Sequence, residues 1–517
     1  MNKKPTIIAF IHYLFTFIND LLFINFKEIN IINYIFIKII LLLLLLVVWN
    51  YGFKIFKRKD SKTILKYFLI ILIPLLILLL LIYPGIWYSD DFNFLEYAKT
   101  CNFLYYLHYI TSIYYSISLS LIPIPTGVAI IQIIIYSLVV TYIIYNLIKI
   151  FDIKKWYKYL LYIVFILPMT LFYAIYPNRP CIYGIFYLLF FSIIFFKIYK
   201  KEDISFKQAI LLLIYSSLLA QWRSEGIYLL LFGPLLICLI SNKKTIKNFL
   251  LLFIISLVSF FIISLPQNIN TKYKYKNYSL SRFVPSVINP LGWMIDNGAI
   301  TNNIEDLNNI NEVIDVDKML EYPVLYDTPC VWNNKCVKEY NGDYKKFMKS
   351  YFNYIIQNKG LFIKAKILTF MMSSGWRNST FEAHDILKID NDIVNNFKNN
   401  YHFNKVINPD IRNIFISLLE GRSFTSHDPL KTYIVINNLL TPLFFLGLTL
   451  LYFLFTKKIK LVILNLLPFI HTALILLTAP ASYFMYYYPV YLVGYFILLF
   501  DIALIIKKLQ KRKCKNV

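Results

Sequence analysis

Long apolar runs separated by short polar stretches dominate the chain from one end to the other. A helix needs about 20 apolar residues to cross a bilayer, and twelve runs approach or reach that length. They are 5–26, 31–53, 64–83, 127–149, 157–176, 181–200, 206–222, 226–240, 248–266, 434–456, 460–480 and 484–506. The pattern predicts an all-α polytopic membrane bundle of about 12 spans. The first run also fits an interfacial helix, because it carries His12, Asn19 and Asp20.

Lysine and arginine follow every even-numbered run, whereas the ends of odd-numbered runs carry almost none. These residues are Lys54, Lys57, Arg58, Lys59, Lys149, Lys154, Lys155, Lys197, Lys200, Lys201, Lys243, Lys244, Lys247, Lys457, Lys458 and the basic tail 507–515. Short cytoplasmic loops are rich in lysine and arginine. One orientation therefore satisfies all the loops: a multi-pass protein of the cytoplasmic (inner) membrane with both termini in the cytoplasm.

Three regions follow from the order of the runs. Residues 1–266 form an N-terminal membrane module with an outer loop at 84–126. Within that loop, the stretch 92–126 mixes aromatic and charged residues and predicts one or two amphipathic helices at the outer interface. The polar block 267–433 predicts a small α-rich extracytoplasmic domain. Residues 434–517 form a C-terminal membrane module with a basic cytoplasmic tail.

Composition supports this assignment. Of 517 residues, 58% are hydrophobic and only 16% are charged, and the formal net charge is +25. Such a basic excess suggests nucleic-acid binding in a soluble protein, but here the lysines lie between apolar runs and indicate membrane topology instead. We expect membrane lipids, and no nucleic acid, as partners. Cys330 and Cys336 are close in sequence, and both a local disulfide and two free thiols are compatible with their spacing.

The most informative polar residues come directly after the third run. The stretch 83–92 leaves the membrane at Tyr83 and presents two adjacent carboxylates, Asp90 and Asp91, on the outer face. A carboxylate can take the proton of an acceptor hydroxyl, and a divalent cation often balances phosphate charge in such reactions. Asp90 and Asp91 are thus candidate catalytic residues, and they would hold the Mg²⁺ or Mn²⁺ if one is used. Two solvated loop acids are the plainer alternative.

Other outer-face residues are candidates for substrate binding. Arg223 and Glu225 either form an internal ion pair or provide a phosphate clamp, because a guanidinium grips phosphate through a fork of donors. Arg179, between two spans, is a candidate for the same phosphate clamp. His108 is either a substrate-binding residue or an amphipathic residue at headgroup level. The tyrosines at 486–488 fit an interfacial aromatic belt, and stacking on a sugar is the alternative.

The order of these features resembles the GT-C superfamily of polytopic glycosyltransferases, which use polyprenyl-phosphate sugars. A span is followed by an outer loop with an acidic pair, amphipathic helices, further spans with outer-face arginines and a late extracytoplasmic domain. The residues 83–85 through Asp90, then His108, then 223–226 resemble an uncharacterised bacterial branch of it. That branch has Pro-Gly, an acidic residue shortly after, a histidine further on, and Arg-x-x-Gly.

The resemblance implies that Asp90 is the catalytic base, that Asp91 supports it, and that Arg223 is the arginine of Arg-x-x-Gly. This sequence departs from the branch at three positions. His108 is followed by tyrosine instead of proline. Residues 179–180 read Arg-Pro where Lys-Asp is common, and residues 482–483 read Ser-Tyr where Arg-Tyr is common.

We therefore expect transfer of a sugar from a polyprenyl-phosphate donor to an extracytoplasmic acceptor, which could be a cell-wall polymer, a lipid or a surface polysaccharide. Two alternatives stay open. A polysaccharide polymerase also carries a large outer loop and outer arginines. A lipid-linked oligosaccharide flippase, which is not an enzyme, needs charges that line a cavity open to both faces and needs little outer domain.

Overall fold

The computed structural model describes residues 3–154, 156–241, 245–274, 284–321, 325, 336–338, 344–375, 392–401, 403, 406–420 and 438–515. Within these ranges the chain is helical and contains no strand beyond an isolated bridge between Ile314 and Val337. The expected all-α class is confirmed for this part of the chain.

Eight of the described helices are long and apolar enough to cross a membrane, so this is a membrane protein by its helices. They are α1 Lys3–Phe23, α2 Ile31–Phe56, α3 Ser61–Leu81, α6 Thr126–Phe151, α9 Arg179–Lys200, α12 Ile246–Lys274, α24 Ile459–Thr478 and α25 Tyr488–Lys515. The predicted runs near 206–240 and 434–456 form shorter helices, α10 Phe206–Trp222, α11 Leu229–Ile240 and α23 Leu440–Phe455. The count of twelve spans stays a prediction.

The run 157–176 is not one helix. It consists of α7 Tyr157–Leu160, the short η2 Ile163–Ile166 and α8 Pro168–Ile175. Pro168 explains the break, because it lacks a backbone N–H and disfavours helical geometry in the residue before it. Leu167 is accordingly extended. The apolar composition of the run concealed this interruption.

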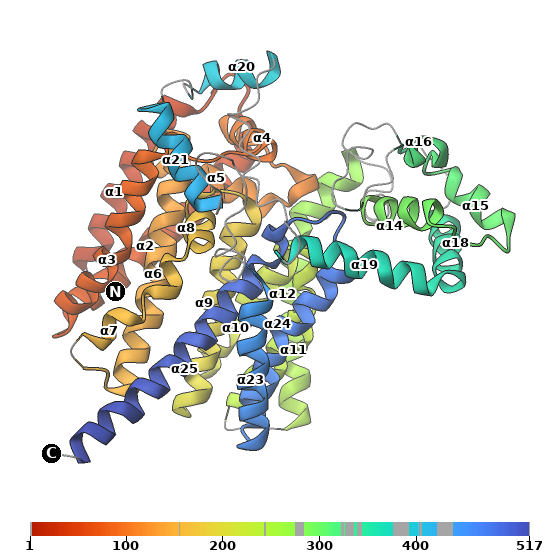
Figure 1. The fold of residues 1–517 in the computed structure, drawn as a ribbon. Helices are drawn as coiled ribbons and strands as arrows, with labels where there is room; N and C mark the ends of the chain where they lie inside the picture. Colours follow the sequence, from red (N-terminus) through yellow and green to blue (C-terminus); the bar gives the residue numbers. More distant parts are fainter. Residues whose placement is uncertain are drawn as a thin grey trace.

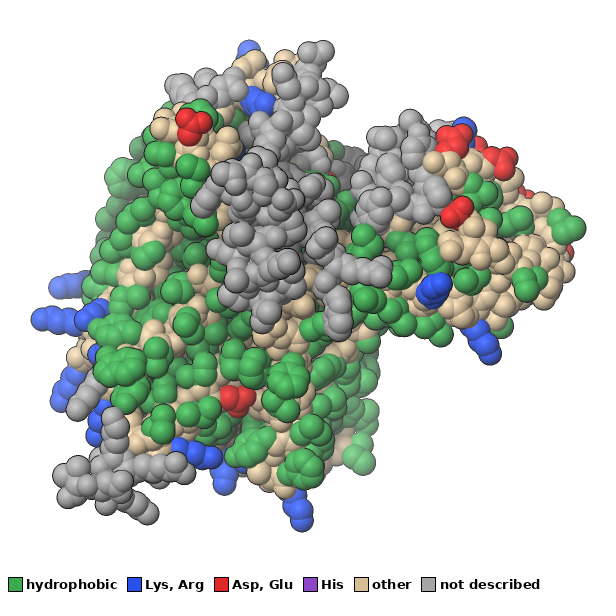
Figure 2. All heavy atoms as spheres, in the orientation of Figure 1, with side chains coloured by type: hydrophobic (Ala, Val, Ile, Leu, Met, Phe, Trp, Pro, Cys, Tyr) green, Lys and Arg blue, Asp and Glu red, His purple; other side chains and the backbone are tan. Residues whose placement is uncertain are grey.

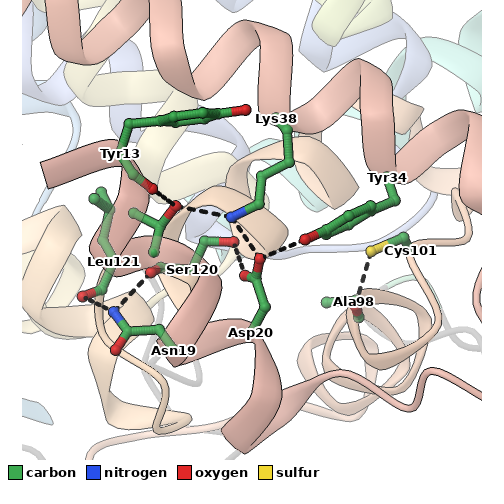
Figure 3. Close-up of polar contacts among 10 residues, drawn as sticks. Tyr13, Asn19, Asp20, Tyr34, Lys38, Ala98, Cys101, Ser120 and Leu121 are labelled. Atoms are coloured by element: carbon green, nitrogen blue, oxygen red, sulfur yellow. Dashed lines mark hydrogen bonds and ion pairs between the residues drawn. The ribbon is translucent and has the colours of Figure 1, made fainter. Parts of the chain in front are cut away.

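The first run forms a long helix that pairs with α2, and a buried polar network joins the two (Figure 3). Asp20 of α1 forms an ion pair of 2.5 Å with Lys38 of α2, and both side chains are buried. Tyr34 and Ser120 each donate a hydrogen bond of 2.8 Å to the Asp20 carboxylate. Asn19 donates to the backbone carbonyl of Ser120. The network therefore attaches the α1–α2 hairpin to the end of α5, Tyr109–Leu121.

The predicted amphipathic stretch after α3 forms two helices, α4 Ser89–Lys99 and α5, joined by the turn η1 Tyr105–Leu107. The structure differs from the expectation of surface helices, because most of α5 is buried. Helices α1, α4 and α6 pack around it. Its serines have different environments: Ser118 donates to the backbone carbonyl of Tyr114 and Ser120 to the Asp20 carboxylate, whereas the Ser116 hydroxyl is buried without a hydrogen-bond partner among the described residues.

The lysine-bearing ends of the helices lie together, as the charge pattern requires. Arg58 donates to the Tyr145 hydroxyl near the end of α6 at 2.6 Å, and the Lys507 ammonium lies 5.5 Å from the Phe151 ring centroid. In Figure 1, α1 begins and α25 ends in this part of the molecule. Figure 2 shows Lys and Arg side chains along the left and lower edges, around an apolar face. We call this the lysine end.

At the opposite end lie α4, α5, α8 and the polar block (Figure 1). Within the block, α14 Val284–Asp296, α15 Ile304–Asn311, α16 Val316–Leu320 and α18 Tyr344–Gln357 enclose a small core of their own, and α19 Lys359–Ser373 links it to α24. Helix α20 Asp392–Asn400 and helix α21 Pro409–Glu420 lie instead over the N-terminal module. Cys336 is disulfide-bonded, which removes the free-thiol alternative for it, and Cys330 lies outside the described residues.

Candidate functional site

A buried turn at residues 82–87 directly precedes the acidic pair and fixes its position. Gly85 has a φ of 105°, a backbone conformation that glycine adopts without strain. Arg412 of α21 donates to the carbonyls of Gly85, at 2.9 Å, and of Ile82, at 3.3 Å. The Trp87 indole donates to the Pro84 carbonyl at 3.0 Å. The turn is thus fixed on several sides, and α4 begins immediately after it with Asp90 and Asp91 in its first turn.

Asp91 is fully buried, and protein groups occupy both of its carboxylate oxygens. Its Oδ2 accepts the backbone N–H of Tyr88 at 2.9 Å, which caps α4, and its Oδ1 lies 2.9 Å from the Tyr115 hydroxyl. Burial raises the pKa of Asp91 to about 7, against the opposing effect of these two hydrogen bonds. Asp91 is therefore a positioning residue of the α4 start, not a group open to a substrate.

The Tyr115 hydroxyl also explains why a neutral Asp91 fits this place. It lies 2.9 Å from Asp91 Oδ1 and 3.0 Å from the Pro177 carbonyl, but it carries only one proton. If Asp91 is ionised, one of these two acceptors has no donor from Tyr115. If Asp91 is protonated, it donates to Tyr115 and Tyr115 donates to Pro177, so that both contacts are hydrogen bonds.

This arrangement predicts an unusual pH dependence for Asp91→Asn. The pKa of Asp91 is higher in the folded chain than its ordinary 3.8, so its contribution to stability is present below about pH 4 and is lost as the pH rises through 7. The asparagine amide donates to Tyr115 as the protonated acid does, at every pH. We expect the variant to be more stable than the wild type at pH 8, by roughly 4 kcal/mol in the free energy of unfolding and with a higher melting temperature. At pH 4 the two proteins should have similar melting temperatures.

Thermal melts of the purified protein in detergent at the two pH values measure this difference. The matched control is Asp410→Asn, which alters an exposed carboxylate in the first turn of α21 at the same end of the molecule. A variant less stable than the wild type at pH 8 would show that the fold stabilises the ionised form of Asp91 and does not raise its pKa.

Asp90 differs from its neighbour because it is only partly buried. Burial raises its pKa, and the positive charge of Arg179 opposes that rise. Arg179 is the first residue of α9, and its Nη1 donates to the Leu107 carbonyl at 2.8 Å. A positive charge at a helix N-terminus is unfavourable for the helix dipole. The helix itself therefore gives no reason for an arginine at this position.

His108 lies close to this group and caps α5. Its Nδ1 accepts the backbone N–H of Ile110 at 3.4 Å, and its Nε2 lies 3.4 Å from the Gln221 side-chain oxygen. The two contacts together fix the neutral tautomer with the proton on Nε2. Its φ of 77° is uncommon for a residue other than glycine. The structure gives His108 a capping role, which the sequence did not predict.

Arg223 and Glu225 form the internal ion pair that was one of the two predicted alternatives. Arg223 Nη2 lies 2.5 Å from Glu225 Oε1, and its Nε donates to Oε2 at 3.2 Å. The guanidinium also lies 5.4 Å from the Tyr486 ring centroid. The third guanidinium nitrogen, Nη1, is buried and has no hydrogen-bond partner. Two nitrogens of the Arg223 fork are therefore occupied, and the Nη1 group with its two N–H donors is left for a ligand or a water molecule.

Tyr486 connects the separate parts of the site. It lies in η5, Phe484–Tyr487, against Arg223, and within electrostatic reach of Arg179 and Tyr88 as well. The structure thus brings Arg179, Arg223 and Glu225 near this ring, and Asp90 lies near Arg179. Sequence reasoning assigned the tyrosine run to an aromatic belt. Its position directly after an outer turn was the only signal for a different role.

Beneath this group lies a polar cluster that the sequence analysis missed. Tyr228 donates to the Tyr187 hydroxyl at 2.8 Å and contacts His471 Nδ1 at 3.3 Å. His471 is fully buried, and it stacks on Tyr183 with ring centroids 6.3 Å apart. Both His471 Nε2 and the Tyr183 hydroxyl have no hydrogen-bond partner. A single histidine in the apolar run of α24 gave no sequence signal for this cluster.

The acidic pair does not fit a divalent cation shared by Asp90 and Asp91. Both Asp91 oxygens already face protein donors, and its raised pKa disfavours the ionised form that a metal requires. No group of three or more His, Cys, Asp or Glu side chains suited to a metal occurs among the described residues. We derive no step through a metal ion.

Comparison with known proteins adds nothing to these geometric observations: no protein-family model matches the chain, and no curated protein or solved structure is detectably similar to it.

Proposed function

We propose that the chain is a GT-C type membrane glycosyltransferase that moves a sugar from a polyprenyl-phosphate donor to an acceptor hydroxyl. The observation that carries the proposal is the proximity of Asp90 to Arg179, together with the positions of Arg179 and Arg223 near Tyr486, which brings together residues from separate segments of the chain. Guanidinium groups donate hydrogen bonds to phosphate, and a carboxylate beside them can take the proton of an acceptor hydroxyl, so the group suits a phosphate-linked sugar.

In the proposed reaction, Asp90 takes the proton of the acceptor hydroxyl as the acceptor oxygen bonds to the anomeric carbon of the sugar. The bond between that carbon and the phosphate oxygen breaks, and polyprenyl phosphate leaves with the bonding electrons. The raised pKa of Asp90 suits this role, because a base works best when its pKa approaches the working pH. The arginines stabilise the negative charge that develops on the leaving phosphate.

The geometry favours Arg179 over Arg223 as the main phosphate ligand. Arg179 is partly exposed and lies close enough to Asp90 to affect its pKa. Arg223 is buried, and two of its nitrogens bond to Glu225. Arg223 therefore orients the site through Glu225 and Tyr486, and it offers only Nη1 to the donor. This order of importance differs from the family resemblance, which emphasises Arg223.

We also propose that the acid-bearing end faces away from the cytoplasm, in the cytoplasmic membrane. Lysines and arginines occupy the other end, as short cytoplasmic loops do. Cys336, in the polar block, is disulfide-bonded, and disulfides persist in oxidising compartments outside the cytoplasm.

Arg179→Lys tests the phosphate contact. Lysine offers a single point charge without the planar fork, so we expect KM for the polyprenyl-phosphate donor to rise about tenfold or more while kcat changes little. The measurement is sugar transfer in membranes over a range of donor concentrations. An unchanged KM would remove Arg179 from donor binding.

A paired change separates the two roles of Arg223. Arg223→Met alone leaves the Glu225 carboxylate buried and unpaired, and we expect a poorly folded protein. Arg223→Met together with Glu225→Met removes both charges and should restore folding. Sugar transfer by this double variant at the wild-type rate would show that Arg223 acts only through Glu225 and that Nη1 does not contact the donor.

A further inference from the structure

The lower ends of α9 and α11 and the turn between α23 and α24 lie at the lysine end, away from α4 (Figure 1). A cleft of about 780 Å³ lies between the end of α9, the end of α11 and this turn. Five lysines line it: Lys197, Lys201, Lys457, Lys458 and Lys460. The volume falls within the range of small-molecule binding sites.

The acids of the cleft do not balance its lysines. Glu202 lies 4.0 Å from Lys197 and also pairs with Lys200, and Asp203 is the other acid of the lining. Lys201 and Lys457 are exposed and have no ion-pair partner among the described residues. The cleft therefore keeps an excess of positive charge that a negatively charged group can neutralise.

Two of these lysines have backbone conformations that disfavour a side chain. Lys201 and Lys457 adopt left-handed φ angles of 57° and 53° just after the ends of α9 and α23. Glycine or asparagine usually occupies such positions, because a side chain costs energy there. If lysines were needed here only to mark a cytoplasmic loop, neighbouring positions with ordinary backbone angles would serve without this conformational cost.

The cleft also has an apolar wall. Ile240, Ile459 and Leu461 line it beside the lysines, and the Ile459 side chain is 56% exposed. Lys458 lies 5.9 Å from the ring centroid of Tyr199, which is another lining residue. A ligand in this place meets cations on one side and, at the ends of the spanning helices, hydrocarbon on the other.

We propose that this cleft binds the phosphate headgroup of an anionic phospholipid. Lysines between membrane helices neutralise such headgroups, and adjacent apolar surface accommodates the acyl chains. A free phosphate compound has the same charge but no use for the apolar wall or for a position at the membrane boundary. The site is separate from the proposed glycosyltransferase site and does not depend on it.

The test is native mass spectrometry of the purified full-length protein, delipidated and then exposed to vesicles of phosphatidylglycerol or of phosphatidylcholine. We expect retained phosphatidylglycerol and little phosphatidylcholine. The variant Lys201→Gln with Lys457→Gln should bind phosphatidylglycerol about thirtyfold more weakly. Each lysine near a membrane surface strengthens the binding of anionic lipid about fivefold, and the variant loses two of them.

The matched control is Lys57→Gln with Lys59→Gln, two exposed lysines of the α2–α3 turn at the same end of the molecule that do not line the cleft. This pair removes the same charge and should leave phosphatidylglycerol binding unchanged. Equal losses in both pairs, or equal retention of the two lipids, would overturn the proposal. Competition by inorganic phosphate at the concentration of the lipid would assign the cleft to a soluble anion instead, which also overturns it.

Discussion

Asp90→Asn is expected to reduce sugar transfer by about a hundredfold to ten-thousandfold, the usual cost of losing a general base. The asparagine keeps the shape of the side chain but cannot take the acceptor proton. The side chain is only partly buried, and its pKa is raised by burial against the opposing charge of Arg179. Transfer of labelled sugar from a polyprenyl-phosphate donor, in membranes from cells that express each variant, measures the effect.

Two further variants make this result specific. Asp410→Asn removes an exposed acid of α21 at the same end and should retain full activity. Asp91→Asn should fold and retain most of its activity, since the Asp91 carboxylate bonds to Tyr88 and Tyr115 instead of facing the site. Wild-type activity in Asp90→Asn, with normal expression and membrane insertion, would eliminate Asp90 as the base.

Lys38→Met is expected to destabilise the α1–α2 hairpin by about 3–5 kcal/mol, because it leaves a buried carboxylate without its cation. Asp20 and Lys38 are 1% and 4% exposed and lie 2.5 Å apart (Figure 3). The hairpin carries no residue of the proposed reaction, but it contacts α5, whose first residues follow His108. Unfolding in increasing denaturing detergent, followed by the fluorescence of the tryptophans, measures the loss.

The single variant Asp20→Asn, which leaves Lys38 buried without its counterion, and the double variant Asp20→Asn with Lys38→Met complete the cycle. In the double variant the amide oxygen still accepts from Tyr34 or Ser120, and no buried charge is left, so we expect most of the lost stability to return. If the two single losses simply add in the double variant, Asp20 and Lys38 do not act as a pair.

The class of the protein could be predicted from the sequence because apolar runs and lysine positions are local signals. An apolar run indicates a helix at its own position, and the lysines of a loop indicate the side of the membrane on which that loop lies. The limits of that method appear at 157–176, where Pro168 breaks a run that composition alone describes as continuous. They appear again at α5, which belongs to a stretch whose mixture of aromatic and charged residues suggested surface helices, although its neighbours bury it.

The candidate site could be predicted only in part, because its members interact over long distances in the sequence. The residues Asp90, Arg179 and Arg223 were found as unusual charges beside apolar runs. The different roles of Asp90 and Asp91 could not be predicted from the sequence, because they depend on contacts of Asp91 and Tyr115 and on the carbonyl of Pro177. Lys38 and His471 lie within apolar runs, and only their partners, Asp20 and Tyr228, make their roles visible.

The most direct test of the proposed function uses the purified wild-type protein in lipid vesicles that contain a polyprenyl-phosphate-linked sugar. The acceptor is supplied to one side of the vesicle at a time, and the sidedness of the protein is determined by proteolysis of the 507–515 tail. We predict that polyprenyl phosphate and glycosylated acceptor form in equal amounts when the acceptor is on the side of the membrane that Asp90 faces, opposite the lysine end. An intact donor under that condition, or equal product from either side, would contradict the account.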